Sequence, residues 1–226
     1  MKRKSLQGVA IMEFALAMLV MVPLLLGTIG CGLQLIQSMQ TIQLARDAGR
    51  MYARGLDFSQ AGNKTILAAL GSDVGLKTNG TGSAVMILST VVYIDKGMCL
   101  TAGKPVDAGG NPIGCPNYKK WVFAQRIVVG NVNFRTSNLG GPLTTGPDPV
   151  LVDATTGKIS LDDQVNNAGD VAAFAAIGNP FVSLADSGTL DTLPSGQVLY
   201  VTEAGTLGFT MKPFALGGGM YAYSVF

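Results

Sequence analysis

The sequence predicts an α+β protein in which a long N-terminal helix packs against a mainly antiparallel β-sheet head. Three observations favour this fold class. An apolar run over residues 9–36 exceeds the roughly 20 residues that a helix needs to cross a bilayer. An amphipathic pattern with helical spacing continues this run to about residue 54. Beyond residue 55 the chain is rich in Gly, Asn, Thr and Ser and contains short β-branched runs, which is typical of strands joined by turns.

The composition narrows the classes of function. Charged residues make up 13% of the 226 residues, about half the share of a soluble domain, which favours a membrane segment. A net charge of +2 and the lack of a dense basic patch in the main domain argue against a nucleic-acid partner. Histidine is absent, which excludes Ser-His-Asp and Cys-His catalysis and removes the commonest zinc ligand. We find no nucleophile beside a base, so we expect no enzyme activity, no cofactor and no metal site.

The first residues place a short basic leader before the apolar run. Lys2, Arg3 and Lys4 precede Gly8, and few basic residues follow the run closely. Because basic segments stay on the cytoplasmic side of a membrane, we expect the N-terminus to be cytoplasmic. The bulk of the chain then faces the periplasm or the cell exterior.

Glu13 is the one acidic side chain inside the apolar run. An ionised carboxylate in hydrocarbon costs several kcal/mol, so its presence needs a reason. If the chain is cut after Gly8, Val9 gains a positively charged α-amino group that Glu13 can neutralise in its own or a neighbouring subunit. Alternatively, Glu13 extends to the lipid headgroups near the start of the helix. On physical grounds both interpretations stay open.

Pro23 lies in the middle of the run. Proline removes one backbone hydrogen bond, so we expect a kink in the helix at this position. Gly27, Gly30 and Gly32 follow, and small residues let helices approach each other closely. Alternatively, these glycines reflect only the ordinary composition of a transmembrane segment, and we favour that interpretation.

The continuation of the helix has two distinct faces. Arg46, Arg50 and Arg54 recur every four residues and form a basic ridge. One interpretation is that this ridge contacts an acidic partner or lipid headgroups. The other is that it is a solvated face beside Asp47, and such ridges are more often solvated faces. Apolar residues at steps of three and four form the opposite face, which we expect to pack on the head: Leu35, Met39, Ile42, Ala45, Gly49, Tyr52 and Leu56.

Three motifs in this N-terminal quarter occur together. Gly8 is followed by four residues and then by Glu13-Phe14, which is similar to the processing site of class IVb prepilins. The apolar run, with its proline and its glycine-rich exit, is followed by LARDAGRMYA at residues 44–53. In this combination, residues 1–56 resemble the TadE-like proteins of tight-adherence (Flp, type IVb) pilus systems.

The resemblance implies a pilin-like division of the chain and a place for each part. Residues 1–8 would be a leader that prepilin peptidase removes between Gly8 and Val9, which changes the formal charge from +2 to −1. Residues 9–36 would span the bacterial inner membrane once, and residues 37–56 would extend the stem helix. Residues 57–226 would form a periplasmic head, which becomes extracellular if the subunit is assembled in a pilus.

The resemblance also implies a function and partners. The protein would be a minor pilin or pseudopilin that assembles a tight-adherence or type IV-like pilus or a secretion filament. Its partners would be prepilin peptidase, the pilus assembly platform, the membrane, and other pilin subunits in a homo- or hetero-oligomeric filament. The alternative is a single-pass anchored adhesin or envelope protein that is never built into a filament and keeps residues 1–8.

The cysteines add two further hypotheses. Cys99 and Cys115 flank a turn-rich segment, and a disulfide between them is plausible outside the cytoplasm. A loop of this length would gain about 3 kcal/mol from closure; the alternative is two free thiols. Cys31 follows Thr28 in a sequence similar to a lipoprotein cleavage box. Against this, Thr28 replaces the usual aliphatic residue, Glu13 interrupts the apolar region, and the helical pattern continues past Cys31.

The head is expected to contain short elements. The residues favour helices at 59–70 and 162–176 and strands at 84–94, 121–134, 197–203 and 221–226. The first two strands should form an antiparallel hairpin, with the second strand bent near Gly130, and residues 138–149 should form a surface loop. Ser160 is placed to cap the second helix. Asp162 and Asp163 then either complement the N-terminus of that helix, which we favour, or contribute to a calcium site.

Overall fold

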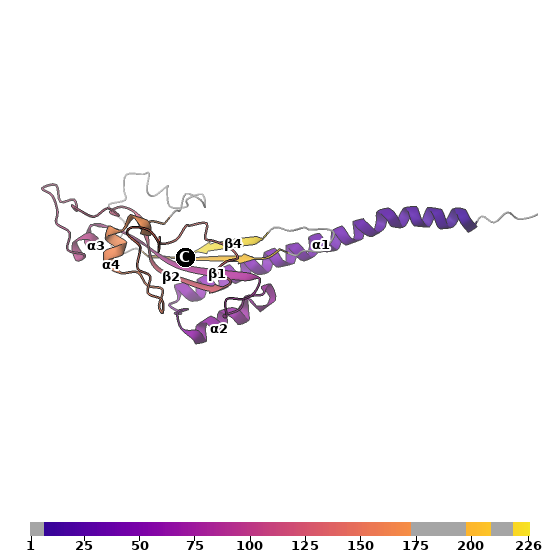
Figure 1. Cartoon of the computed structure of the whole chain (residues 1–226), viewed down its shortest axis with the longest axis horizontal. Helices are drawn as coiled ribbons and strands as arrows, with labels where there is room; N and C mark the ends of the chain where they lie inside the picture. Colours follow the sequence, from indigo (N-terminus) through magenta and orange to yellow (C-terminus); the bar gives the residue numbers. More distant parts are fainter. Residues whose placement is uncertain (1–6, 173–197, 209–218) are drawn as a thin grey trace, which may run out of the picture.

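The computed structural model describes residues 7–172, 198–208 and 219–226. Its longest element is α1 (Gln7–Ala53), a helix of 47 residues. The N-terminal part of α1 projects away from the rest of the molecule, and the C-terminal part lies along the sheet of the head (Figure 1). The predicted fold class is confirmed, because an α+β head carries a long apolar N-terminal helix.

A four-stranded antiparallel sheet forms the centre of the head. Its strand order is β2-β1-β3-β4. The predicted hairpin between the first two strands is confirmed, with Leu88 opposite Ile127 and a register shift between Thr90 and Val91. The bounds of the four strands are β1 (Ala84–Tyr93), β2 (Trp121–Gly130), β3 (Val198–Thr206) and β4 (Met220–Val225).

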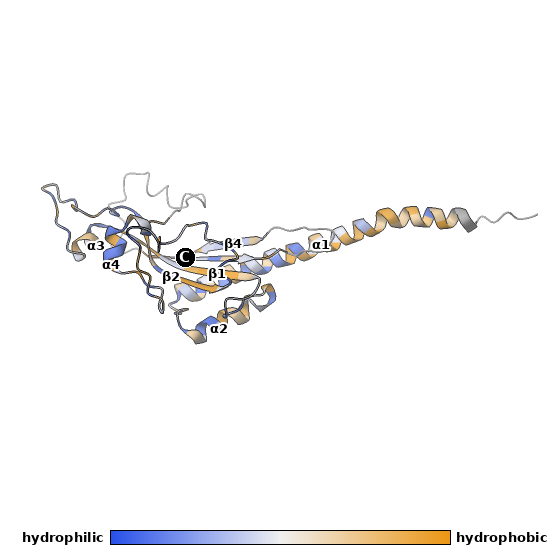
Figure 2. Ribbon diagram, viewed as in Figure 1, coloured by the Kyte–Doolittle hydropathy of each residue, from blue (hydrophilic) through white to orange (hydrophobic). Residues whose placement is uncertain are grey.

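Both faces of this sheet are covered. On one face α1 and α2 (Ala61–Leu70) bury a core that includes Leu44, Met86 and Ala204. On the other face, segments between residues 131 and 172 bury a second core around Phe123 and Val201. A strand buried on both faces needs apolar residues on both. This explains the nearly continuous apolar sequence of β1, which Figure 2 shows in orange.

Short helices lie at the end of the head that is distant from the projecting part of α1 (Figure 1). α3 (Lys96–Thr101) is capped at its N-terminus by Asp95, whose side chain accepts a hydrogen bond from the Met98 backbone N–H at 2.8 Å. α4 (Leu161–Asn166) is capped at its N-terminus by Ser160, whose Oγ accepts from the Asp163 backbone N–H at 3.1 Å. The predicted cap at Ser160 is therefore confirmed. The described residues also form two single-turn helices, η1 (Ser72–Val74) and η2 (Ala168–Asp170).

Two predicted boundaries are wrong for identifiable reasons. β2 ends at Gly130 and not at residue 134, because Gly130 has φ of +100° and a Cβ there would lie 2.5 Å from the Ala84 carbonyl oxygen. α4 ends at Asn166, far short of residue 176. Asn167 adopts an extended backbone, and its side chain accepts from the Gly169 N–H to start η2. Positions 173–176 lie outside the described residues.

The predicted apolar face of the stem is only partly correct. Ala45, Gly49 and Tyr52 are buried against the head. In contrast, Leu35 is 63% exposed and Met39 is 62% exposed. The head meets the helix only from about Thr41 onward, so the preceding apolar residues have no part of the described head opposite them.

Candidate functional site

The projecting part of α1 is an exposed apolar surface. Ile11, Phe14 and Leu19 are 69%, 63% and 73% exposed, and only 6% of the most apolar window of the helix is buried. Within the described residues, α1 is the helix that is long and apolar enough to cross a bilayer. Figure 2 shows this part of α1 mostly in orange. Such a surface is stable next to lipid or next to other apolar helices, but not in water.

The residues of the predicted processing site lie at the start of this surface. Gly8 and Val9 belong to the first turns of α1, and Glu13 and Phe14 follow on exposed positions. Glu13 is exposed, and no described residue forms a hydrogen bond or an ion pair with its carboxylate. The geometry is consistent with either role considered for Glu13.

A groove runs along the exposed part of α1 beside Pro23. It is lined by small residues, including Gly27, Cys31 and Gly32, and by leucines at either end. A Cβ added at Gly27 or Gly32 would meet no heavy atom within 4 Å. The helix continues through Pro23, and the predicted kink stays a prediction. The groove therefore offers a surface on which a second apolar helix can approach the backbone closely.

The C-terminal part of α1 is fixed to the head by hydrogen bonds and by close packing. Thr202 Oγ1 on β3 donates a hydrogen bond to the Ala45 carbonyl oxygen at 2.7 Å, so the sheet is bonded directly to the backbone of the helix. Thr41 Oγ1 lies 3.0 Å from Thr206 Oγ1 in a buried contact. Close approach is possible because Gly49 presents no side chain to the sheet. These contacts make α1 a rigid stem for the head.

Tyr52 fixes the last turn of the stem. Its hydroxyl lies 2.6 Å from Thr90 Oγ1 and donates to Gln125 Oε1 at 2.9 Å, so it connects α1 to both β1 and β2. Its ring packs edge-on against Tyr200 with centroids 5.1 Å apart. Burial raises the pKa of Tyr52 to about 12, so the hydroxyl stays protonated at physiological pH.

The predicted basic ridge lies on the solvent side of the stem. Arg46, Arg50 and Arg54 are exposed, and α1 ends at Ala53, immediately before the last of them. Arg50 Nη1 lies 3.9 Å from Asp47 Oδ1, an exposed pair that contributes little to stability. The arrangement agrees with a solvated face, and a partner for it stays a hypothesis.

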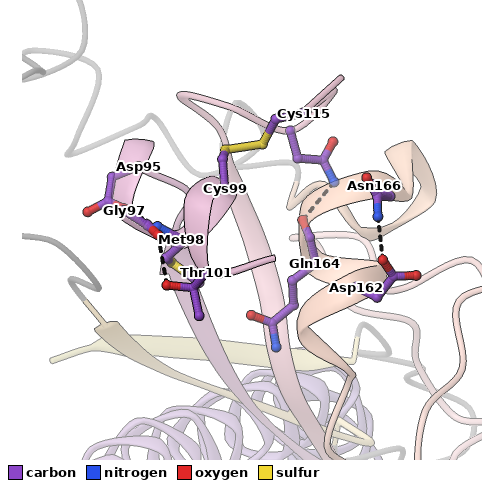
Figure 3. Close-up of a disulfide and its surroundings, with 10 residues drawn as sticks. Asp95, Gly97, Met98, Cys99, Thr101, Cys115, Asp162, Gln164 and Asn166 are labelled. Carbon is purple, nitrogen blue, oxygen red and sulfur yellow. Dashed lines mark hydrogen bonds between the residues drawn. A yellow bond between two sulfur atoms is a disulfide. The ribbon is translucent and has the colours of Figure 1, made fainter. Parts of the chain in front are cut away.

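The structure joins Cys99 and Cys115 in a disulfide, across 16 positions of the sequence. Cys99 lies in α3 and Cys115 in the loop that returns to β2, and Figure 3 shows the bond beside α4. Both cysteines are buried together with Val165 of α4 in a small apolar cluster. The disulfide therefore closes the part of the head that is most distant from the exposed stem. Cys31 is free and exposed on α1.

Sequence reasoning missed a buried carboxylate on β3. Glu203 is 1% exposed and lies on the sheet face opposite to α1. Tyr221 Oη donates to its Oε1 at 2.5 Å, the Asn138 backbone N–H donates to the same oxygen at 2.9 Å, and Ser137 Oγ donates to Oε2. The carboxylate thus joins β3, β4 and the segment after β2. A signal existed, because the chain has only two glutamates and one of them follows a β-branched run.

A second buried acid, Asp170, also went unnoticed. It is 0% exposed, and neither carboxyl oxygen has a hydrogen-bond partner among the described residues. Burial, and to a smaller extent the charge of Asp163, raises the pKa of Asp170 to about 8. Asp163 and Asp162 instead serve the start of α4, and the described residues contain no cluster of acids, histidines or cysteines that could hold a metal ion.

The raised pKa of Asp170 predicts that the free energy of unfolding falls as the pH rises from about 4 to about 8. In the unfolded chain this aspartate has a pKa near 4, so it releases its proton at a lower pH than in the folded protein. The contribution of Asp170 is complete below pH 4 and is lost as the pH rises through about 8, at no more than about 1.4 kcal/mol per pH unit. Asp170→Asn should remove this slope and be more stable than the parent at pH 8. Urea unfolding of both proteins at pH 5 and pH 8 tests this, and parallel pH profiles would disprove it.

Comparison with known protein families finds a match in the stem. The family model described as TadE-like protein matches residues 8–50. This range lies within α1, so the match covers the stem and not the head. Neither a curated protein nor a solved structure matches the chain. The resemblance predicted from the sequence is thus confirmed for the N-terminal helix: over residues 8–50 this chain is similar to TadE-like proteins.

Proposed function

We propose that the protein is a structural pilin-like subunit, a minor pilin or pseudopilin of a tight-adherence or type IV-like pilus or secretion filament. The observation that supports this most is the division of α1. One continuous helix has an exposed apolar part of membrane-spanning length and a second part that is fixed rigidly to a folded head. Because both parts belong to one rigid helix, the packing of the apolar parts of neighbouring stems would fix the positions of their heads.

The proposed path begins in the inner membrane with the N-terminus in the cytoplasm and the head in the periplasm. Prepilin peptidase removes residues 1–8, which takes away three basic residues and frees the α-amino group of Val9. Glu13 neutralises that amine in a neighbouring subunit and so sets the register between stems. The assembly platform then moves the subunit into a filament with other pilin subunits. The role is structural, without catalysis.

The groove beside Pro23 supports helix-to-helix assembly. Gly27 and Gly32 leave the helix backbone accessible, and in an apolar environment close van der Waals packing favours association of such surfaces. Aliphatic side chains at the ends of the groove would interdigitate with those of a neighbouring stem. The head remains outside this contact and stays free for other interactions.

Glu13→Ala and Glu13→Gln test the proposed electrostatic contact. Loss of a charge pair in an apolar environment costs several kcal/mol, and every 1.4 kcal/mol is about tenfold in an equilibrium constant. We expect the filament or sheared fraction to fall by at least about tenfold, with unchanged amounts of protein in the membrane. Quantitative immunoblotting of both fractions measures the effect.

Asp47→Asn is the matched control, because it removes an exposed carboxylate from the same helix outside the apolar part. It should assemble like the parent protein. If both Glu13 variants also assemble like the parent, the proposed contact between Glu13 and a neighbouring amine is wrong.

A further inference from the structure

A cleft lies on the face of the sheet opposite to the stem. It has a volume of about 400 Å³ and is formed by β1, β2 and the segment after β2. Arg126 and Arg135 line it, together with Ser137 and the apolar residues Ile87 and Val128. Ile87 pairs with Val128 on one side and with Glu203 on the other, which places the cleft beside the buried carboxylate.

Arg126 presents a partly desolvated guanidinium group to this cleft. Its Nη1 donates to the Gly140 carbonyl oxygen at 2.8 Å, and its Cζ lies 5.3 Å from the centre of the Phe123 ring. Burial lowers the pKa of Arg126, while the negative charge of Glu203 opposes that shift. The one hydrogen bond from Nη1 leaves the other guanidinium donors available to an acceptor in the cleft.

Arg135 contributes a second guanidinium group with an unmet donor. Its Cζ lies 4.3 Å from the centre of the Tyr221 ring, which fixes the plane of the group. Its Nε is buried and has no hydrogen-bond partner among the described residues, and its Nη2 is 3.4 Å from Asn138 Oδ1, a weak contact. A buried N–H without an acceptor is costly, and a ligand can supply that acceptor.

The nearby carboxylate does not compensate both cations. Glu203 is occupied by Tyr221, Asn138 and Ser137, as described above. Among the described residues, neither Arg126 nor Arg135 has a carboxylate oxygen within 4.0 Å of its guanidinium nitrogens. The cleft therefore holds an excess of positive charge in a partly dehydrated setting, which an anion would offset.

We propose that this cleft is a binding site for a small oxyanion, a phosphate monoester or carboxylate group attached to an apolar body. The planar guanidinium groups of Arg126 and Arg135 bind the oxyanion, since their paired N–H donors match the geometry of two oxygens. Ile87 and Val128 contact the apolar body. Nothing in this site requires filament assembly, so it stands apart from the proposed function.

Arginine side-chain NMR on the full-length protein in detergent micelles tests the site. The chain has six arginines, so ¹⁵N-arginine labelling gives few Nε–Hε signals. Phenyl phosphate and inorganic phosphate are the two probes, and the first adds an apolar body to the second. The signals of Arg126 and Arg135 should shift saturably with a dissociation constant of about 1 mM for phenyl phosphate and weaker binding of inorganic phosphate.

Two variants separate specific binding from general attraction. Arg126→Lys keeps the charge but loses the planar pair of donors, so it should weaken phenyl phosphate binding by about tenfold. Arg54→Gln removes an exposed arginine of the stem ridge and should leave the titration unchanged. The proposal is overturned if Arg126 and Arg135 do not shift saturably, if all arginines shift alike, or if Arg126→Lys binds like the parent.

Discussion

Replacing Gly49 by valine should lower the free energy of unfolding of the head by about 3 kcal/mol, the upper end of the usual overpacking penalty. A Cβ at Gly49 would lie 2.2 Å from Cε2 of Phe226 and 2.8 Å from Oγ1 of Thr202. Phe226 is 39% exposed and its ring can turn aside, but Thr202 is fully buried in the sheet, so the clash with Thr202 remains. Thr202 must then give up its bond to the Ala45 carbonyl oxygen.

The measurement is urea unfolding in mild detergent, together with limited proteolysis of the segment between α1 and α2, residues 54–60. Gly62→Val is the matched control, because Gly62 is also helical and a Cβ there meets nothing within 4 Å. That variant should stay within about 0.5 kcal/mol of the parent, as most surface substitutions do. If the Gly49 variant is as stable as the control, the stem is not fixed to the sheet in the manner described.

Glu203→Leu should lower the free energy of unfolding further, by about 4 kcal/mol, and Glu203→Gln should lower it by about 2 kcal/mol. Leucine leaves the donors of Tyr221, Asn138 and Ser137 buried without an acceptor. Glutamine keeps the shape, but its amide N–H group must face one of these donors. Ser137 cannot adapt freely, because its Oγ also accepts from the Leu139 N–H at 3.0 Å.

Unfolding midpoints in urea at neutral pH give these differences. Asp73→Asn serves as the control, since it removes one exposed carboxylate from the same head without a change in the buried network. Tyr221→Phe removes one of the three donors and should cost about 1 kcal/mol. A Glu203→Leu protein that unfolds at the same urea concentration as the control would show that the network contributes nothing to stability.

The stem and the sheet could be predicted because local patterns specify them. The apolar run and the steps of three and four define α1, and β-branched runs define β1 and β2. Cap chemistry is equally local, and Ser160 was identified for that reason. The end of β2 does not follow from local sequence, because it depends on how closely Gly130 approaches a neighbouring strand, which is a tertiary contact.

The remaining features depend on which segments meet in space. Glu203 is an unremarkable strand residue until β4 and the segment after β2 bring donors to it. The residues of α1 that pack on the head could be predicted only in part, because apolar spacing does not reveal where the head begins to cover the helix. Thr41 is buried through its contact with Thr206, which lies 165 positions away. The basic cleft of Arg126 and Arg135 likewise needs the folded chain.

The central claim is that α1 is the stem of a processed pilin-like subunit, and the N-terminus of the protein purified from membranes tests it most directly. N-terminal sequencing with intact-mass measurement should give a chain that begins at Val9 and has lost the mass of residues 1–8. An anchored adhesin or envelope protein shares the helix but keeps those residues. A chain that begins at Met1, or one that begins at a lipidated Cys31, would contradict the account.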